Sequence, residues 1–219
     1  MAMFNTVLNI IYPPQCRVCE VIIAPEDVFC QPCLGKVKPI VSMRLPVTKS
    51  YIMPVYALST YTEPLRPMVL KKFHNDRLAS RQLAALMLRM TALATLPIDG
   101  IIPVPLHWTR YAWRGFNQAC EMARVIAQGR NAPLLRCVMR SRRTTFQWML
   151  TAEARRNNVK NVFTLHPWYR IIGTETLRGK HLVIVDDLCT TGATLIQVAK
   201  LLARYEPASI TAVVACRSV

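Results

Sequence analysis

Two acidic residues stand beside a threonine-rich turn in the segment 182–195, which reads LVIVDDLCTTGATL. The apolar run 182–185 predicts a buried strand, and the residues from Ala193 onward predict a helix. Asp186 and Asp187 would then lie at the carboxyl edge of a sheet, where open α/β folds bind ligands. The small residues before the helix let backbone N–H groups converge at its N-terminus, which is a typical phosphate cradle. The pattern predicts a site for a phosphorylated sugar whose hydroxyls donate hydrogen bonds to the two carboxylates.

A purely structural interpretation takes these residues as part of a buried strand, a capping Asp and turn formers. It explains each feature alone, but not two acids at a strand end, a Thr-Thr-Gly turn and a helix in direct succession. The Gly-Lys-Ser/Thr ending of a P-loop is missing. The segment closely resembles the PRPP motif of type I phosphoribosyltransferases, four apolar residues followed by Asp-Asp-x-x-Thr-Thr-Gly. The resemblance implies that Asp186 and Asp187 hold the ribose diol of phosphoribosyl diphosphate (PRPP), which the family binds with Mg²⁺. It also implies a 5′-phosphate loop made of Leu188, Cys189, Thr190, Thr191, Gly192, Ala193 and Thr194.

A second polar loop follows the short strand expected at 100–104. Two arginines, a glycine and two amides at the carboxyl end of a strand suit a diphosphate or a nucleic-acid backbone. Solvated arginines in a connecting loop are the alternative. Aromatic residues interleave with the arginines, which fits stacking on single-stranded bases or a loop folded onto the domain. The candidate diphosphate-loop residues are Pro105, Leu106, His107, Arg110, Arg114, Gly115, Asn117 and Gln118.

Two further stretches give a wider resemblance. Pro-Val-Pro-Leu-His at 103–107 and Arg-Gly-Phe-Asn-Gln at 114–118 resemble the signature of the ComF family of phosphoribosyltransferase-like competence proteins. The same family pattern is matched at Thr144, Gln147, Leu150, Arg155, Asn158, Val159 and Phe163. The segment 71–76 departs from it, because a further basic residue and a glycine are expected there. The resemblance implies a cytoplasmic factor of natural transformation that takes up single-stranded DNA. Its partners would be an uptake channel or a DNA-handling motor, met at the inner face of the membrane.

Four cysteines near the start form two Cys-x2-Cys pairs separated by ten residues. Four thiolates complete the tetrahedron of a structural zinc site. Reduced thiols in a small core, or a redox pair, are the alternatives. A segment of about 20 residues hardly builds a core without a staple, so zinc is the better interpretation. The expected ligands are Cys16, Cys19, Cys30 and Cys33; the other four cysteines fit core positions, although Cys189 could be exposed within the phosphate loop.

The formal net charge of +16 suggests a polyanionic partner. The window 110–160 holds eleven basic and two acidic side chains, so more than half of the surplus lies there. A solvated basic surface is the alternative. The nucleic-acid candidates are Arg140, Arg142, Arg143, Arg155, Arg156 and Lys160.

No apolar run approaches the roughly 18 residues that span a bilayer, and the stretch 1–12 lacks a secretory signal, so we expect a cytoplasmic chain that does not cross the membrane.

These residues need a scaffold, and alternating elements from residue 99 onward predict one. We expect an α/β fold with a parallel sheet flanked by helices, as in type I phosphoribosyltransferases, preceded by a small zinc-ribbon-like module. Residues 1–40 would hold a helix at 4–12 and the four-cysteine module, and residues 41–219 the phosphoribosyltransferase-like domain. The proline-containing stretch 39–54 is the expected boundary. Strands are expected at 51–61, 100–104, 159–165, 182–185 and 209–216, and helices at 76–95, 117–128 and 193–205.

Three functions remain open at this point. One is the competence factor that the ComF resemblance implies. Another is an active transferase that moves phosphoribose onto an unidentified small acceptor, and the third is a PRPP-sensing regulator that does not catalyse. An intact Asp-Asp-Thr-Thr-Gly loop supports ligand binding in all three, whereas the basic window favours the DNA role.

Overall fold

The computed structural model describes residues 13–25, 27–38, 40–62, 64–69, 76–106, 115–140, 162–171 and 174–218. The helix expected at 4–12 lies outside these ranges. The named elements, in chain order, are α2 (Gln31–Leu34), β1 (Ile40–Pro46), β2 (Ile52–Thr60), α3 (Arg66–Val69), α4 (Arg77–Met90), η2 (Ala92–Ala94), β3 (Gly100–Pro103), α6 (Gln118–Arg130), β4 (Val138–Arg140), β5 (Phe163–Leu165), α8 (Pro167–Ile171), η4 (Thr174–Thr176), β6 (His181–Cys189), α9 (Ala193–Ala203) and β7 (Ser209–Arg217).

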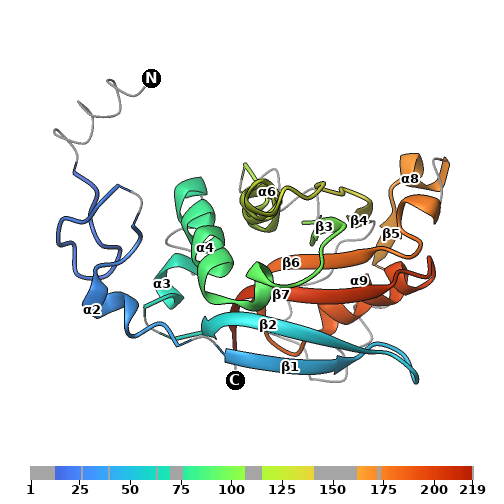
Figure 1. Cartoon of the computed structure of the whole chain (residues 1–219), viewed down its shortest axis with the longest axis horizontal. Helices are drawn as coiled ribbons and strands as arrows, with labels where there is room; N and C mark the ends of the chain where they lie inside the picture. The colour runs from blue at the N-terminus through green and yellow to red at the C-terminus, as the bar shows by residue number, and fades with distance from the viewer. Residues whose placement is uncertain are drawn as a thin grey trace.

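A five-stranded sheet runs through the centre of the molecule in the order β1-β2-β7-β6-β3 (Figure 1). Strands β2, β7, β6 and β3 are parallel, and β1 pairs antiparallel with β2 at one edge. The middle strand β7 is buried from Ile210 to Cys216, as a strand covered on both faces must be. The expected α/β fold with a parallel sheet is confirmed.

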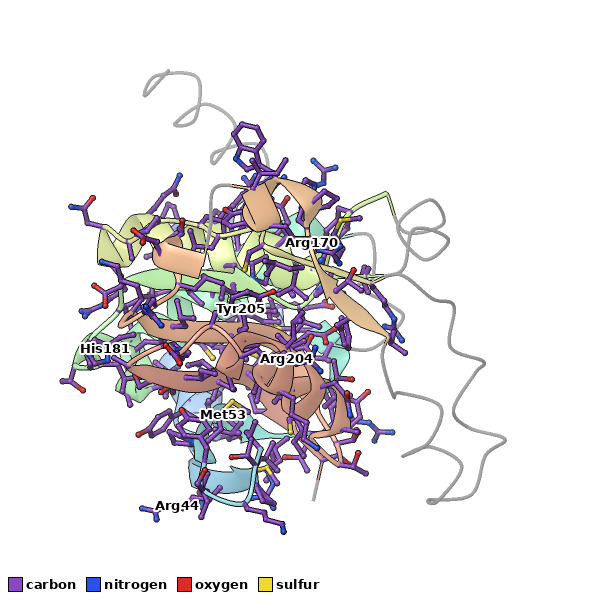
Figure 2. All side chains as sticks on the ribbon, turned by 90° about the vertical axis from the view of Figure 1, so that its right-hand side faces the viewer. Arg44, Met53, Arg170, His181, Arg204 and Tyr205 are labelled. Atoms are coloured by element: carbon purple, nitrogen blue, oxygen red, sulfur yellow. The ribbon has the colours of Figure 1, made fainter. Side chains whose placement is uncertain are left out.

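Helices cover the two faces of this sheet (Figure 1). One face packs against α9 and the β4–β5 hairpin, through side chains such as Leu195, Val198 and Leu165. The other face packs against α3, α4 and α6, through side chains such as Leu83, Met87 and Ile126. Charged side chains such as Arg44 and Arg170 point away from the body, whereas Met53 lies fully inside it (Figure 2).

The cysteine module packs onto the helical layer. Val28, Phe29 and Cys33 belong to the same buried cluster as the core side chains of α4. Arg17 forms an ion pair of 3.1 Å with Asp76 and a hydrogen bond of 3.0 Å to Gln82. Asp76 also caps α4, because its carboxylate accepts from the N–H of Ala79 at 3.0 Å. The module therefore sits at the N-terminal end of α4.

The structure corrects two expected elements and adds a strand that was not expected. Within the stretch 39–54, β1 occupies 40–46 and pairs with β2. The strand expected at 159–165 does not join the parallel sheet; β5 pairs antiparallel with β4 in a separate two-stranded sheet. The helix expected at 76–95 ends at Met90, because the side chain of Thr91 donates to the carbonyl of Met87 and starts the short 3-10 turn η2.

Candidate functional site

The acid pair lies within a strand rather than after one. Strand β6 continues to Cys189, four residues beyond the expected end, because Asp186, Leu188 and Cys189 keep pairing with β7. The Asp186 carboxylate accepts a hydrogen bond of 2.9 Å from the N–H of Asp187. The two side chains also interact, because the carboxyl group of Asp187 acts on that of Asp186 both through its charge and through a side-chain hydrogen bond.

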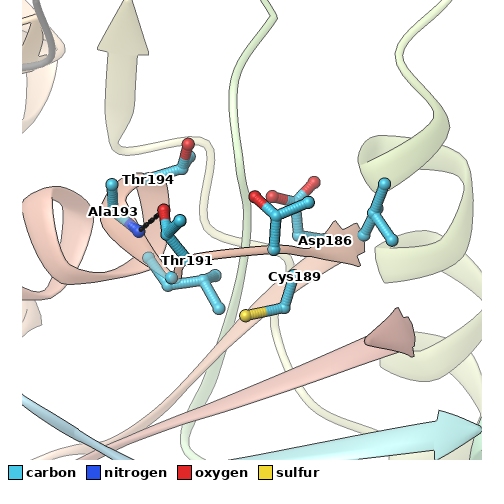
Figure 3. A pocket seen from close by; sticks show the side chains of 9 residues that line it. Asp186, Cys189, Thr191, Ala193 and Thr194 are labelled. Carbon is cyan, nitrogen blue, oxygen red and sulfur yellow. Dashed lines mark hydrogen bonds between the residues drawn. The ribbon is translucent and has the colours of Figure 1, made fainter. Parts of the chain in front are cut away.

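The turn that follows contains only Thr190, Thr191 and Gly192 before α9 begins. The hydroxyl of Thr191 accepts from the N–H of Ala193 at 3.4 Å. A concavity of about 50 Å³ opens here, lined by Asp186 and residues 188–195. Figure 3 shows the hydroxyls of Thr191 and Thr194 and the carboxylate of Asp186 on the upper side of the strand, and the Cys189 sulfur below it. The concavity has the size and the donors that a single phosphate needs.

Gly192 shapes this cradle. Its φ of +73° lies in the left-handed region, and a Cβ placed on it would lie 2.4 Å from Cδ1 of the buried Leu45. Leu45 of strand β1 therefore packs directly against the turn 190–192. A side chain at 192 is excluded both by backbone conformation and by this close approach.

Replacing Gly192 with alanine is expected to destabilise the protein by about 1–3 kcal/mol, because it combines left-handed strain with overpacking against Leu45. Gly179→Ala is the matched control, since Gly179 has a φ of +66° with nothing within 4 Å of the added carbon. Thermal unfolding of the two variants separates the contributions. Equal losses of stability would show that the contact with Leu45 is unimportant.

Burial and mutual repulsion dominate the electrostatics of the acid pair. Burial, and then the charge of Asp187, raise the pKa of Asp186 well above its ordinary value, while Arg140 lowers it less strongly. Burial also raises the pKa of the Cys189 thiol to about 11, and its sulfur contacts that of Met43 at 3.9 Å. The expectation that Cys189 could be exposed is wrong; it is an inert, buried wall of the loop.

The diphosphate-loop candidates are partly described. Pro105 and Leu106 are half-buried after β3, and Gly115 is exposed with a φ of +70°. The side chain of Asn117 donates to the carbonyl of Val104 at 3.0 Å and caps α6. Gln118 is buried in the first turn of α6. The remaining candidates, His107, Arg110 and Arg114, lie outside the described residues.

Arg77 holds this loop from the neighbouring helix. Its guanidinium donates to the carbonyl of Gly115 at 3.5 Å and lies 5.4 Å from the ring centre of the buried Phe116. Phe116 is therefore a packing residue, as one of the two sequence interpretations had it. Arg77 and Asp76 are neighbours in sequence, so one end of α4 contacts both the cysteine module and the residues Gly115 and Phe116.

Two residues near the acid pair were not anticipated. Arg217 pairs with Cys189 and lowers the pKa of that thiol, and its carbonyl accepts from the N–H of Tyr61 at 2.7 Å. Tyr61 is near enough to Asp187 for that charge to affect its pKa, which burial raises. Tyr61 follows β2 and Arg217 is the last residue of β7, and both strands end at the same edge as β6. The parallel order of β2, β7 and β6 is the signal that would have found them.

The four N-terminal cysteines come together as expected. Their sulfur atoms all lie within 4.8 Å of one another, and those of Cys19 and Cys30 are 3.5 Å apart. Tetrahedral zinc with Zn–S bonds of about 2.3 Å sets sulfur atoms about 3.8 Å apart, so the cluster fits the ion. Within the described ranges, this is the one His, Cys, Asp and Glu cluster of metal-binding geometry.

The surroundings of these thiols also favour thiolates on one side of the cluster. Burial alone would raise the pKa of the Cys16 thiol. Hydrogen bonds from the backbone N–H groups of Cys19, Cys30 and Val18 outweigh burial, and the pKa is lowered to about 6. Burial and the neighbouring thiols raise the pKa of Cys33 to about 12. A cation is what would stabilise four sulfurs so close together as thiolates.

Among the nucleic-acid candidates, only Arg140 is described. It ends β4, lies 5.6 Å from the ring centre of Phe163, and interacts electrostatically with Asp186. Arg140 is therefore half-buried near the acid pair and does not lie on a fully exposed surface. Arg142, Arg143, Arg155, Arg156 and Lys160 lie outside the described residues.

Comparisons with known proteins fit both parts of the chain. A phosphoribosyl transferase domain profile matches residues 140–218, and a double zinc ribbon domain profile matches residues 7–45. DNA utilization protein YhgH of Shigella flexneri is 32% identical over 217 residues, covering 93% of this chain and 90% of that protein. Competence protein F of Haemophilus influenzae is 35% identical over 150 residues, covering 65% and 63%. Competence protein ComFC of Bacillus subtilis is 29% identical over 119 residues, covering 54% and 44%.

Proposed function

The chain belongs to the ComF family, and we propose that it is a cytoplasmic competence factor that binds PRPP and handles single-stranded DNA during natural transformation. Relatives named as competence proteins, together with the phosphoribosyl transferase domain, support a competence-related role. An uptake channel or a DNA-handling motor would be its partner at the membrane. No helix in the described ranges combines the length and hydropathy that a membrane span needs.

The observation that carries PRPP binding is the placement of the acid pair beside the phosphate cradle. Asp186 lines the same concavity as Thr190, Thr191 and the first turn of α9. A 5′-phosphate in the cradle would accept from these hydroxyls and from the N–H groups at the start of α9. The ribose diol would then reach the carboxylates at the end of β6. Mg²⁺ would neutralise the diphosphate, which candidates 105–118 would hold. Calorimetric titration with Mg²⁺ and PRPP tests this part directly, and the absence of saturable heat would remove PRPP from the proposal.

An active phosphoribosyltransferase is the second candidate function, favoured by a larger cavity beside Arg140. In such a transfer, the acceptor forms a bond to C1′ of the sugar as the diphosphate leaves with the electron pair of the bond that breaks. The chain's own contribution would be to fix the sugar and to exclude other orientations, because the transition state resembles a sugar cation.

Basic and aromatic side chains near the β4–β5 hairpin support the DNA role. Arg136 precedes β4 and is exposed, and Trp168 and Arg170 are exposed on α8. The carbonyl of Cys137 accepts from the N–H of His166 at 2.7 Å, which brings the starts of β4 and α8 together. The other five candidates belong to the chain segment that connects Arg140 to β5. Exposed aromatic rings beside cations are typical of surfaces that bind single strands.

Single-stranded DNA is expected to bind with little sequence preference and with an affinity that falls steeply with salt. Each neutralised phosphate adds about −0.7 to the log–log slope. Charge reversal at Arg142, Arg143, Arg155 and Arg156 should flatten this slope and abolish transformation, while PRPP binding is largely retained. Fluorescence anisotropy of a labelled oligonucleotide at several salt concentrations measures the slope.

The matched control reverses four exposed charges elsewhere, at Lys49, Lys180, Lys200 and Arg204. This variant has the same net charge as the first one, so it should keep most of the parent slope if the binding surface is local. Equal slopes in the two variants would mean that only net charge matters. A parent protein that shows no salt-dependent retention of single strands would remove DNA from the proposal.

A further inference from the structure

A cavity with a volume of about 330 Å³ lies beside the carboxyl end of β3. Three elements form its walls. Pro105 and Leu106 follow β3, Cys120 comes from the first turn of α6, and Val138 and Met139 come from β4. These walls are mainly apolar, and the volume lies at the lower end of the range for small-molecule sites. The cavity thus suits a flat hydrocarbon surface of one or two rings.

The polar side chains that line the cavity give it a positive charge. Arg136 and Arg140 line it, and no acidic side chain is among the described residues that do. The amide of Asn117, which also lines it, is already engaged with Val104 and with the N-terminus of α6. A ligand with an anionic group at one end could therefore place that group against the exposed guanidinium of Arg136.

The cavity also lies close to the acid pair. Pro103, one of its lining residues, pairs with Val185, and the N–H of Val104 donates to the carbonyl of Val185 at 2.9 Å. Asp186 is the next residue along β6, and the charge of Arg140 lowers its pKa, although burial and Asp187 raise it more strongly. Arg140 is therefore common to the cavity and to the surroundings of Asp186. A sugar held by Asp186 would therefore lie next to this cavity.

From these observations, we propose that this cavity binds a small aromatic acid, with its ring against Leu106 and Met139 and its anionic group toward Arg136. The position of this ligand next to a sugar rests on the proposed PRPP site. The existence of the cavity and its positive charge do not depend on that proposal. The occupant is a small molecule of one or two rings, which deepens the transferase alternative by naming the chemical class that the protein would accept. A base of single-stranded DNA is the competing occupant, which the experiment distinguishes.

Ligand-observed NMR with 2-naphthoate as the probe tests the proposal on the full chain. 2-Naphthoate is expected to bind the parent protein, and 2-naphthamide, which has the same ring without the charge, about tenfold more weakly. Arg136→Gln and Met139→Ala should each weaken 2-naphthoate by about fivefold to tenfold. Both residues are exposed, so the variants should fold. Arg204→Gln, which removes an exposed charge at the end of α9, should leave the affinity unchanged.

Several results would overturn the proposal: no binding of 2-naphthoate, equal affinity for the amide, or no effect of Arg136→Gln. Displacement of bound 2-naphthoate by an oligothymidylate at saturating concentration would assign the cavity to DNA instead. PRPP binding is measured in parallel on the same samples by calorimetry. A parent protein that binds 2-naphthoate but not PRPP would remove PRPP from the proposed function and leave this inference standing; the reverse result would refute this inference alone.

Discussion

Replacing Asp186 and Asp187 together with alanine is expected to weaken PRPP binding by at least about 2 kcal/mol, or roughly 30-fold. Two charge-assisted hydrogen bonds to the ribose diol are lost in this variant. Calorimetry with Mg²⁺ and PRPP measures the difference. The variant should remain folded, because both side chains are only partly buried at the edge of the sheet. Equal affinity in parent and variant would reject the assignment of the pair to the ribose.

Asp186→Asn keeps the shape of the side chain and removes its charge, so it tests how the charge of Asp186 affects the stability of the fold. Burial and Asp187 raise the pKa of Asp186 in the folded state, so the charged form destabilises the fold. The stability of the parent is therefore full at low pH and decreases as pH rises through the folded pKa. Asp186→Asn should unfold at a higher temperature than the parent at alkaline pH, where Asp186 is charged, and the difference should disappear in acid. A variant that is less stable than the parent at neutral pH would contradict this reasoning.

Removing zinc is expected to have the largest effect on stability. Freshly purified protein should hold one zinc per chain, and a chelator should release it with loss of order in the N-terminal module. The effect should extend to α4, because Val28, Phe29 and Cys33 share a core with that helix. A loss of several kcal/mol is expected, since metal binding and folding are coupled in such modules. Elemental analysis and thermal unfolding with and without chelator measure both parts.

A pair of cysteine variants sharpens the zinc experiment. Cys19→Ser removes an exposed member of the cluster and should lower zinc content and thermal stability. Cys120→Ser changes a cysteine outside the cluster and should retain one zinc per chain. The absence of zinc from reduced protein, or equal zinc content in the two variants, would exclude the four-thiolate site.

Local motifs were the part of the molecule that the sequence predicted well. The two Cys-x2-Cys pairs form a compact cluster, and the segment 182–195 forms a strand, a turn and a helix as expected. Both predictions depend on residues that are near each other in the chain, so spacing is enough to place them. The parallel sheet was predictable for the same reason, because each strand and helix has its own hydrophobic period.

The residues that the sequence analysis missed depend on pairing between distant strands. Leu45 meets Gly192 because β1 folds back along β2, and no local pattern predicts that contact. Arg217 reaches Cys189 because β7 and β6 are adjacent and in register. The same pairing extends β6 past its two acids to Cys189. The apolar run alone predicts a strand that ends at Val185. Register is a property of the assembled sheet, and short apolar runs do not encode it.

The position of β7 in the middle of the sheet has a consequence for the order in which the molecule is assembled. Strands β1 and β2 can pair as soon as they are made, and β3 can pair with β6, but β2 and β6 meet only through β7, which follows both in the chain. Until β7 inserts, the protein consists of two unfinished sheets, each with an open parallel edge that other strands can join. Contacts between elements so far apart in sequence also form slowly. Insertion of β7 both joins the two halves of the sheet and brings Arg217 beside Cys189, so the candidate site is complete only when those open edges are closed.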